Sequence, residues 1–154
     1  MDHAYHEAGH AVAAALLGAE VVRVTLDSDR EDHDGHCEVH WRGLDPDSVA
    51  RLSLRVAFAG PIAELCYRGE LPEDAATLSA WRGDHAEAER CLRALGPRVD
   101  PERERLAAIA ELVRVFEDVD VWERVARVAD ALDAHGELDA DLFADAIDTL
   151  PGGF

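Results

Sequence analysis

The chain has 154 residues, of which 31% are charged and 48% hydrophobic, a composition typical of a folded globular protein rather than a disordered one. Its formal net charge of −18 argues against nucleic acid and anionic membranes as partners, because both would repel it. No apolar stretch approaches the ~18 residues that span a bilayer, and we find neither a signal peptide nor an ATP-binding P-loop pattern.

The length fits one domain over residues 1–154, with a metal-binding part over 1–95 and a helical part over 97–154. The three cysteines are odd in number and include no Cys-x-x-Cys pair, so we expect neither a disulfide framework nor a thiolate metal site. Free thiols are typical of a reducing compartment, and we therefore expect a cytoplasmic location.

The first predicted element is a helix that begins at Asp2, as a cap, and ends at Gly18, where a left-handed residue would stop it. Most of its residues are small or apolar, so much of this helix should be buried. Gly9 costs about 1 kcal/mol of helix propensity relative to alanine. A glycine at this position indicates that another segment packs closely against the helix.

This helix carries a His-Glu-x-x-His motif at positions 6–10. Residues four apart lie on the same helix face, so His6 and His10 can bind one zinc ion. Glu7 follows the first ligand and can act as general base toward a water that the metal activates. The alternative is a solvated helix with two ordinary histidines. His3 lies near the same face and is expected to remain at the surface or close to the site.

Two strands are predicted next, over Glu20–Leu26 and His36–Trp41, and they can form an antiparallel pair. Side chains alternate along a strand, which places His36, Glu38 and His40 on one face. The two histidines would lie roughly 13 Å apart, too far to share an ion, so we expect a polar face rather than a second metal site. A peptide substrate could add to this strand at the sheet edge.

Asp45 and Pro46 are a cap and a first-turn proline, and they predict a helix that runs to about Phe58. Gly60-Pro61 should kink or restart this helix, because proline cannot donate the next helical hydrogen bond. The continuation is expected to end after Arg68, at a glycine.

A catalytic zinc site needs three protein ligands, and the first helix supplies two. Glu64 lies in an apolar run, where it is either on a solvated helix face, paired with a buried positive partner, or near the metal. A further helix is predicted from Asp84 to Leu95, after a loop. The candidates for the third ligand are Asp84, Glu64, Glu87 and His85. Alternatively, Asp84 only caps its helix together with Glu87.

The remainder is predicted to be helical, over 101–116, 121–134 and 139–150. Leu106 and the apolar residues that follow it at helical spacing should belong to the core. The predicted fold class is therefore mainly α (α+β), a helical domain with a small two- or three-stranded β-sheet near the active site.

Several stretches, taken in chain order, resemble the peptidase domain of FtsH-type ATP-dependent zinc metalloproteases. Tyr5–Ala11 reads the same as the family's Tyr-His-Glu-Ala-Gly-His-Ala helix, and Ala59–Glu64 is similar to its Gly-Gly-x-x-Ala-Glu segment. Gly83-Asp84 resembles an Asn-Asp pair that opens a helix in the family. The family's tryptophan-led helix and leucine-aspartate turn are similar to residues 122–132 and 138–141.

The resemblance implies that His6, His10 and Asp84 bind zinc and that Glu7 is the catalytic base. It also implies that Glu64 lies near the metal.

The chain departs from the family pattern at Gly83, where the family has Asn, and at Pro61. The loop before Asp84 also differs in length. The family's ATPase module and transmembrane helices are absent from these residues.

We therefore expect a stand-alone zinc metalloendopeptidase with one Zn²⁺ per chain. Its substrates would be flexible peptides or unfolded protein segments, reached directly or delivered by a separate ATPase partner. The oligomeric state stays open, a homo-oligomer included. One alternative is a non-catalytic zinc-binding regulatory module of the same ancestry, and another is a helical interaction domain without metal.

Overall fold

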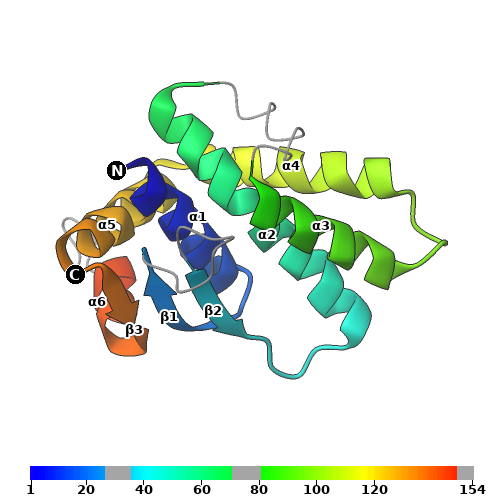
Figure 1. Cartoon of the computed structure of the whole chain (residues 1–154), viewed down its shortest axis with the longest axis horizontal. Helices are drawn as coiled ribbons and strands as arrows, with labels where there is room; N and C mark the ends of the chain where they lie inside the picture. The colour runs from blue at the N-terminus through cyan, green and yellow to red at the C-terminus, as the bar shows by residue number, and fades with distance from the viewer. Residues whose placement is uncertain (27–35, 71–80, 149–154) are drawn as a thin grey trace.

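A computed structural model of the chain describes residues 1–26, 36–70 and 81–148. Six helices and three strands lie in these ranges (Figure 1). Their bounds are α1 Asp2–Leu16, β1 Glu20–Thr25, β2 His36–His40, α2 Pro46–Arg68, α3 Arg82–Leu95, α4 Pro101–Glu117, α5 Val119–His135, β3 Glu137–Asp139 and α6 Ala140–Asp148. The predicted mainly α fold with a small sheet is confirmed. The turn predicted between the first two strands, most of the loop predicted before α3, and the end of the last predicted helix lie outside the described ranges.

Helix α1 is the central element, with α2 packed on one side, α5 on another and β1 below it (Figure 1). Its small side chains allow this, because they let neighbouring helices approach from several directions. Ten of its fifteen residues are buried. As predicted, the chain leaves the helix through Gly18, which has a φ of +100°.

Helix α2 approaches α1 closely at Gly9. A Cβ atom on Gly9 would lie 2.5 Å from the Cβ of Ala63 and 2.7 Å from the carbonyl oxygen of Ala59. The close packing predicted from this glycine is therefore confirmed.

Helix α2 begins as predicted, with the Asp45 side chain accepting a hydrogen bond of 2.8 Å from the Ser48 amide. The prediction that the helix restarts at Pro61 is wrong, because one helix runs from Pro46 to Arg68. Every residue from 57 to 65 is buried. We attribute the continuity to this burial against α1 and α3, which outweighs one lost hydrogen bond.

The sheet has the strand order β2-β1-β3, and both pairings are antiparallel. The predicted pairing of the first two strands is confirmed, whereas β3 forms where the last predicted helix was expected to begin. On β2, His36, Glu38 and His40 are exposed, and Cys37 and Val39 are partly buried. The predicted alternation of this strand is therefore confirmed, and β2 lies at an edge of the described sheet.

Helix α4 packs against α2 and α5, and α5 packs against α1 and α6. Asp100 caps α4 and Asp118 caps α5, each by accepting backbone amide hydrogen bonds. Leu106 was predicted to be buried, but it is 53% exposed. The buried stripe of α4 is formed by Ala108, Ile109, Leu112 and Phe116, and the last three of these were predicted. Leu106 lies off that stripe.

Two predicted helix starts are corrected by the structure. Asp2 does not cap α1, since Met1 occupies that position and the Asp2 carboxylate accepts a 3.0 Å hydrogen bond from Arg68. Asp84 does not open α3, which begins at Arg82. Asp84 is instead in the first turn, and its carboxylate contacts the side chains of His6 and His10.

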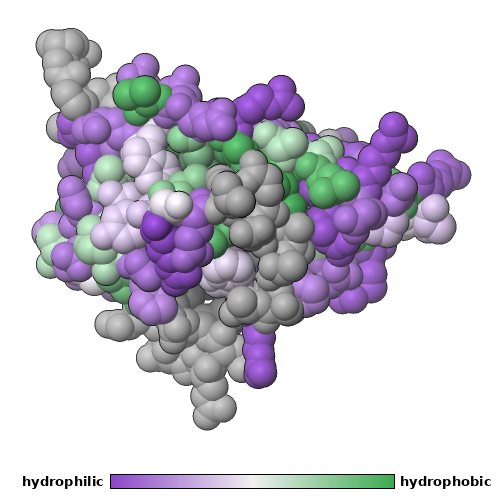
Figure 2. Space-filling model, turned by 90° about the horizontal axis from the view of Figure 1, so that it is seen from above, coloured by the Kyte–Doolittle hydropathy of each residue, from purple (hydrophilic) through white to green (hydrophobic). Residues whose placement is uncertain are grey.

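Across the described ranges, no helix combines the length and apolar character that a membrane crossing requires. Figure 2 shows hydrophilic residues over most of the coloured surface of one face, with smaller hydrophobic patches between them.

The contact at Gly9 leads to a stability prediction. We expect Gly9→Ala to lower the free energy of unfolding by about 1–2 kcal/mol, because overpacking typically costs 1–3 kcal/mol and outweighs alanine's better helix propensity. Urea denaturation measures this change.

The double variant Gly9→Ala/Ala63→Gly is the control, because it removes the Cβ that the new side chain would meet. Gly9→Ala should lower the free energy of unfolding less in the Ala63→Gly background than in the wild-type background. A Gly9→Ala protein more stable than wild type would show that α1 and α2 can separate without cost.

Candidate metal centre

The two motif histidines project from the same face of α1. Their Nε2 atoms lie 3.2 Å apart, and their ring centroids are 4.8 Å apart. The intervening Glu7 is 7% exposed and His10 is also 7% exposed. Ligand atoms of His6, Glu7 and His10 lie within 4.8 Å of one another, so this group could hold a metal ion.

Hydrogen bonds at the opposite ring nitrogens fix how each imidazole presents its Nε2. The Nδ1–H of His10 donates to the carbonyl oxygen of Val56 at 2.6 Å. The Nδ1–H of His6 donates to Glu64 Oε1 at 3.2 Å. A neutral imidazole with its proton on Nδ1 has a lone pair on Nε2, which is the form that binds metals.

Asp84 contacts both imidazoles from α3. Its Oδ2 lies 2.7 Å from His6 Nε2, and its Oδ1 lies 3.1 Å from His10 Nε2. Ligands at tetrahedral angles around a zinc ion with bonds of about 2.0–2.1 Å would lie about 3.3 Å from one another. The three side chains therefore have nearly the mutual spacing of a zinc ligand set.

The other candidates for a third ligand lie elsewhere. Glu64 contacts the Nδ1 side of His6, away from the shared Nε2 atoms. Glu87 pairs with Arg90 and with the thiol of Cys91. The His85 side chain is exposed, and its backbone amide bonds to the chain at the start of α3. Of the four candidates, the structure brings Asp84 to the Nε2 atoms.

Glu64 is the centre of a hydrogen-bond network behind the cluster. It is 5% exposed, so its charge requires partners. In addition to His6, it accepts from Arg68 Nη2 at 2.6 Å and from the indole Nε1–H of Trp81 at 3.3 Å. Arg68 also reaches Asp2 at 3.0 Å. Glu64 was a candidate from the sequence, whereas Arg68 and Trp81 were not.

The groups of the cluster shift one another's pKa values toward protonated imidazoles and an ionised Asp84 carboxylate. Burial lowers the pKa of His6, but hydrogen bonds to Asp84 and Glu64 outweigh it and raise the pKa to about 10. The pKa of His10 is likewise raised, because Asp84 outweighs burial. Burial raises the pKa of Asp84, but the two imidazoles hold it well below its usual range. A metal bound at Nε2 would replace protons, as is general for such ligands.

The charges of the cluster favour a divalent cation. Glu7, Glu64 and Asp84 contribute three carboxylates, and Arg68 supplies a guanidinium beside Glu64. With both imidazoles neutral, as metal binding requires, the carboxylates of this largely buried group outnumber the guanidinium beside it. Buried charges are costly unless they are paired or coordinate a metal, so a doubly charged cation fits this group.

Gly60 of α2 provides the space for His10. A Cβ atom on Gly60 would lie 2.2 Å from His10 Nε2 and 2.5 Å from Cε1. The imidazole cannot easily turn away, because its Nδ1 is bonded to Val56 of the same helix. A glycine inside an otherwise apolar helical run is the sequence signal for such an approach, although Gly60 together with Pro61 predicted only that the helix kinks or restarts.

The predicted substrate-binding strand lies close to the cluster. Strand β2 contacts α1, and its exposed residues His36, Glu38 and His40 face away from the core. Burial raises the pKa of the Cys37 thiol, and the charge of Glu7 raises it further. The partly buried face of β2 therefore packs against the core to which α1, the helix of the motif, contributes.

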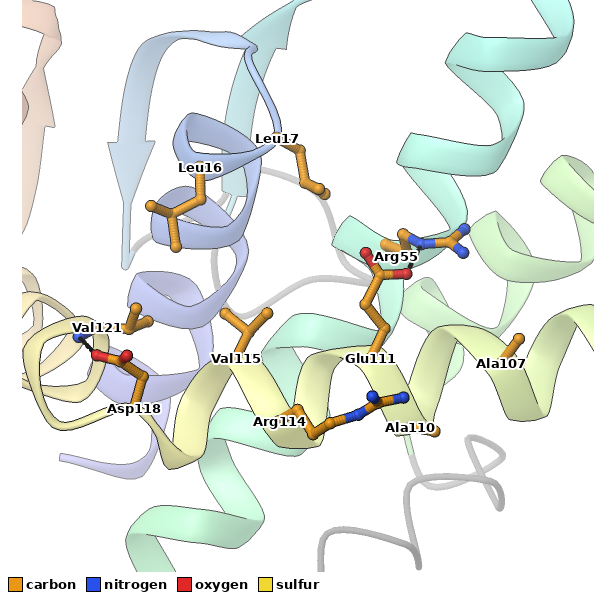
Figure 3. A pocket seen from close by; sticks show the side chains of 10 residues that line it. All are labelled: Leu16, Leu17, Arg55, Ala107, Ala110, Glu111, Arg114, Val115, Asp118 and Val121. Atoms are coloured by element: carbon orange, nitrogen blue, oxygen red, sulfur yellow. Dashed lines mark hydrogen bonds and ion pairs between the residues drawn. The ribbon is translucent and has the colours of Figure 1, made fainter.

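A shallow groove of about 780 Å³ lies between the end of α1 and helix α4 (Figure 3). Apolar side chains, including Leu16, Leu17 and Val115, line it together with the Arg55–Glu111 ion pair of 2.6 Å. None of its lining residues belongs to the metal cluster, and none is a histidine or cysteine. We assign no chemistry to this groove.

No protein-family model matches this chain, and no curated protein matches it either. The resemblance to the FtsH-type peptidase domain therefore stays a prediction from the motifs. What the geometry establishes is a class of site: a buried group with two imidazoles and neighbouring carboxylates that could hold a metal ion.

The contact between Gly60 and His10 can be tested. If the cluster binds a divalent metal, we expect Gly60→Ala to weaken that binding by about tenfold or more, because the added methyl group would displace His10 from its position beside His6 and Asp84. Competition with a chromophoric chelator measures the affinity. Ala59→Gly changes the same helix without adding bulk and serves as a control. Equal metal affinity in Gly60→Ala and wild type would contradict this role of Gly60.

Proposed function

We propose that the protein is a zinc-dependent metallopeptidase, in which His6, His10 and Asp84 bind one Zn²⁺ and Glu7 is the general base. One observation carries the proposal. Two imidazole Nε2 atoms and a carboxylate from a helix 78 residues further along the chain converge within 2.7–3.2 Å of one another.

The donor set and its surroundings fit zinc. Two nitrogens and one carboxylate oxygen leave a tetrahedral zinc ion one open position, which is typical of catalytic rather than structural sites. Both imidazoles also have acceptors at Nδ1, namely Val56 and Glu64. Such acceptors orient zinc-binding histidines and raise their basicity.

The chemistry follows from the position of Glu7. A zinc ion bound here would supply Lewis acidity, which lowers the pKa of water to about 7 and polarises a peptide carbonyl. Glu7 is buried beside the ligands, where its carboxylate can accept the proton of the attacking water. It can then donate that proton to the amine that leaves when the peptide bond breaks. His6 and His10 would remain neutral throughout.

The proposed substrates are flexible peptides or unfolded protein segments. Strand β2 lies at the edge of the described sheet and contacts α1, so an extended segment could pair with it near the helix that carries the motif. Pairing of this kind requires an extended backbone, which folded proteins seldom expose. A separate ATPase partner that unfolds substrates is compatible with this arrangement.

The zinc site makes a direct prediction. Protein purified without added metal should contain one zinc per chain by elemental analysis. Asp84→Ala should weaken zinc binding by more than the roughly 10–100-fold that is typical when a group orienting a ligand is lost. A chelator should lower the melting temperature of wild type, because an ion that binds only the folded state stabilises it.

Asp141→Ala, at an exposed aspartate of α6, is the matched control and should keep full zinc content. Unchanged zinc affinity in Asp84→Ala would remove this residue from the ligand set.

The catalytic role of Glu7 is tested by Glu7→Gln. This variant should retain zinc but lose hydrolysis of an unstructured peptide library, because an amide cannot accept the proton. Mass spectrometry of the products measures the loss. Glu87→Gln, which changes a carboxylate paired with Arg90, should cleave normally. Hydrolysis by Glu7→Gln at the wild-type rate would refute the role of Glu7. A zinc-loaded wild type that cleaves no peptide would favour the non-catalytic zinc-binding module.

A further inference from the structure

The start of α3 carries Asp84 but lacks the usual means of fixing a helix start. Trp81 occupies the N-cap position, with φ −119° and ψ 79°, and no side chain caps the helix. The first helical bond runs from the His85 amide to the carbonyl oxygen of Trp81 at 2.9 Å. Capping side chains typically stabilise a helix by about 1 kcal/mol and define where it begins. Another interaction must therefore set the position of this first turn.

The side chain of Trp81 makes such an interaction with a different helix. Its indole Nε1–H donates to Glu64 Oε2 at 3.3 Å, and its ring packs partly buried against the core. The acceptor is itself fixed, because Arg68 Nη2 holds the same oxygen at 2.6 Å. The other oxygen of Glu64 accepts from His6. Glu64 thus gives the indole a buried acceptor on α2 that two other side chains also contact.

These contacts form a closed circuit around the metal cluster. Trp81 bonds to Glu64, Glu64 bonds to His6, and His6 contacts Asp84 at 2.7 Å. Asp84 returns to Trp81 through the chain, because only Arg82 and Gly83 separate the two residues. Movement of the indole would therefore move Asp84 relative to both imidazoles.

We propose that Trp81 is a positioning residue for the metal site, whose indole N–H holds the first turn of α3 so that Asp84 reaches the two Nε2 atoms. The inference rests on the proposed zinc site and assigns a residue that acts on the ligand set without contacting it. It predicts that the N–H group matters for metal affinity, and that it matters only while Asp84 is present.

The test uses the full chain and measures Zn²⁺ affinity by chelator competition. Trp81→Phe removes the N–H but keeps an aromatic ring, and it should weaken Zn²⁺ binding by roughly 10–100-fold. Trp122→Phe is the matched control, because Trp122 packs against Tyr5 and Phe116 and should leave the affinity unchanged. Trp81→Met is the second variant, since a flexible apolar side chain can fill the space of the indole and also lacks the donor.

The Asp84→Ala background separates positioning from general loosening of the fold. Added to Asp84→Ala, Trp81→Phe should cost no further Zn²⁺ affinity, because coupled residues are non-additive. The visible spectrum of the Co²⁺-loaded protein gives a second measurement. It should change in Trp81→Phe toward that of Asp84→Ala and stay unchanged in Trp122→Phe.

Each outcome decides one statement. Wild-type protein that fails to bind Zn²⁺ would refute the proposed function. Wild type that binds Zn²⁺ while folded Trp81→Phe or Trp81→Met binds it equally well would overturn the positioning role and leave the zinc site intact. An equal loss of affinity in the Asp84→Ala background would also overturn the role, because Trp81 would then act through Glu64 and His6 instead.

Discussion

The close approach of α1 and α2 is the constraint on which the rest of the structure depends. It is made possible by two glycines, one on each helix, at which a Cβ atom would overlap the opposite helix. Gly9 brings the backbones together, and Gly60 leaves room for the ring of His10. The same approach lets His10 donate to Val56 and His6 donate to Glu64. The orientation of both imidazoles therefore depends on the packing of α1 against α2.

The sequence predicted the local part of the site well, and the reason is geometric. His6, Glu7 and His10 lie within one and a half turns of a helix, so their relative positions follow from helical periodicity alone. The close contact at Gly9 was also predicted, because glycine inside a helix is costly unless something needs the space.

The distant part of the site could not be derived in the same way. Asp84 reaches the cluster because α3 packs along α2, and nothing near Asp84 in the sequence specifies that docking. Four acidic or imidazole residues therefore remained open as candidates until the packing distinguished them. The prediction that the helix restarts at Pro61 was wrong for a similar reason, because burial of the surrounding residues keeps the helix continuous. Arg68 could have been found, since it lies one helical turn after Glu64 and such pairs commonly interact.

The uncapped start of α3 has a consequence for the motions of the protein. Stability varies along a chain, and segments with few local restraints open first. The first turn of α3 is restrained through the Trp81 and Asp84 side chains, and both of these contacts converge on the cluster. If a cation binds at the proposed site, its removal should let the amide hydrogens of this turn exchange with solvent well before those of α1. The centre would then open through one hinged helix end, while the buried helix that carries both histidines stays folded.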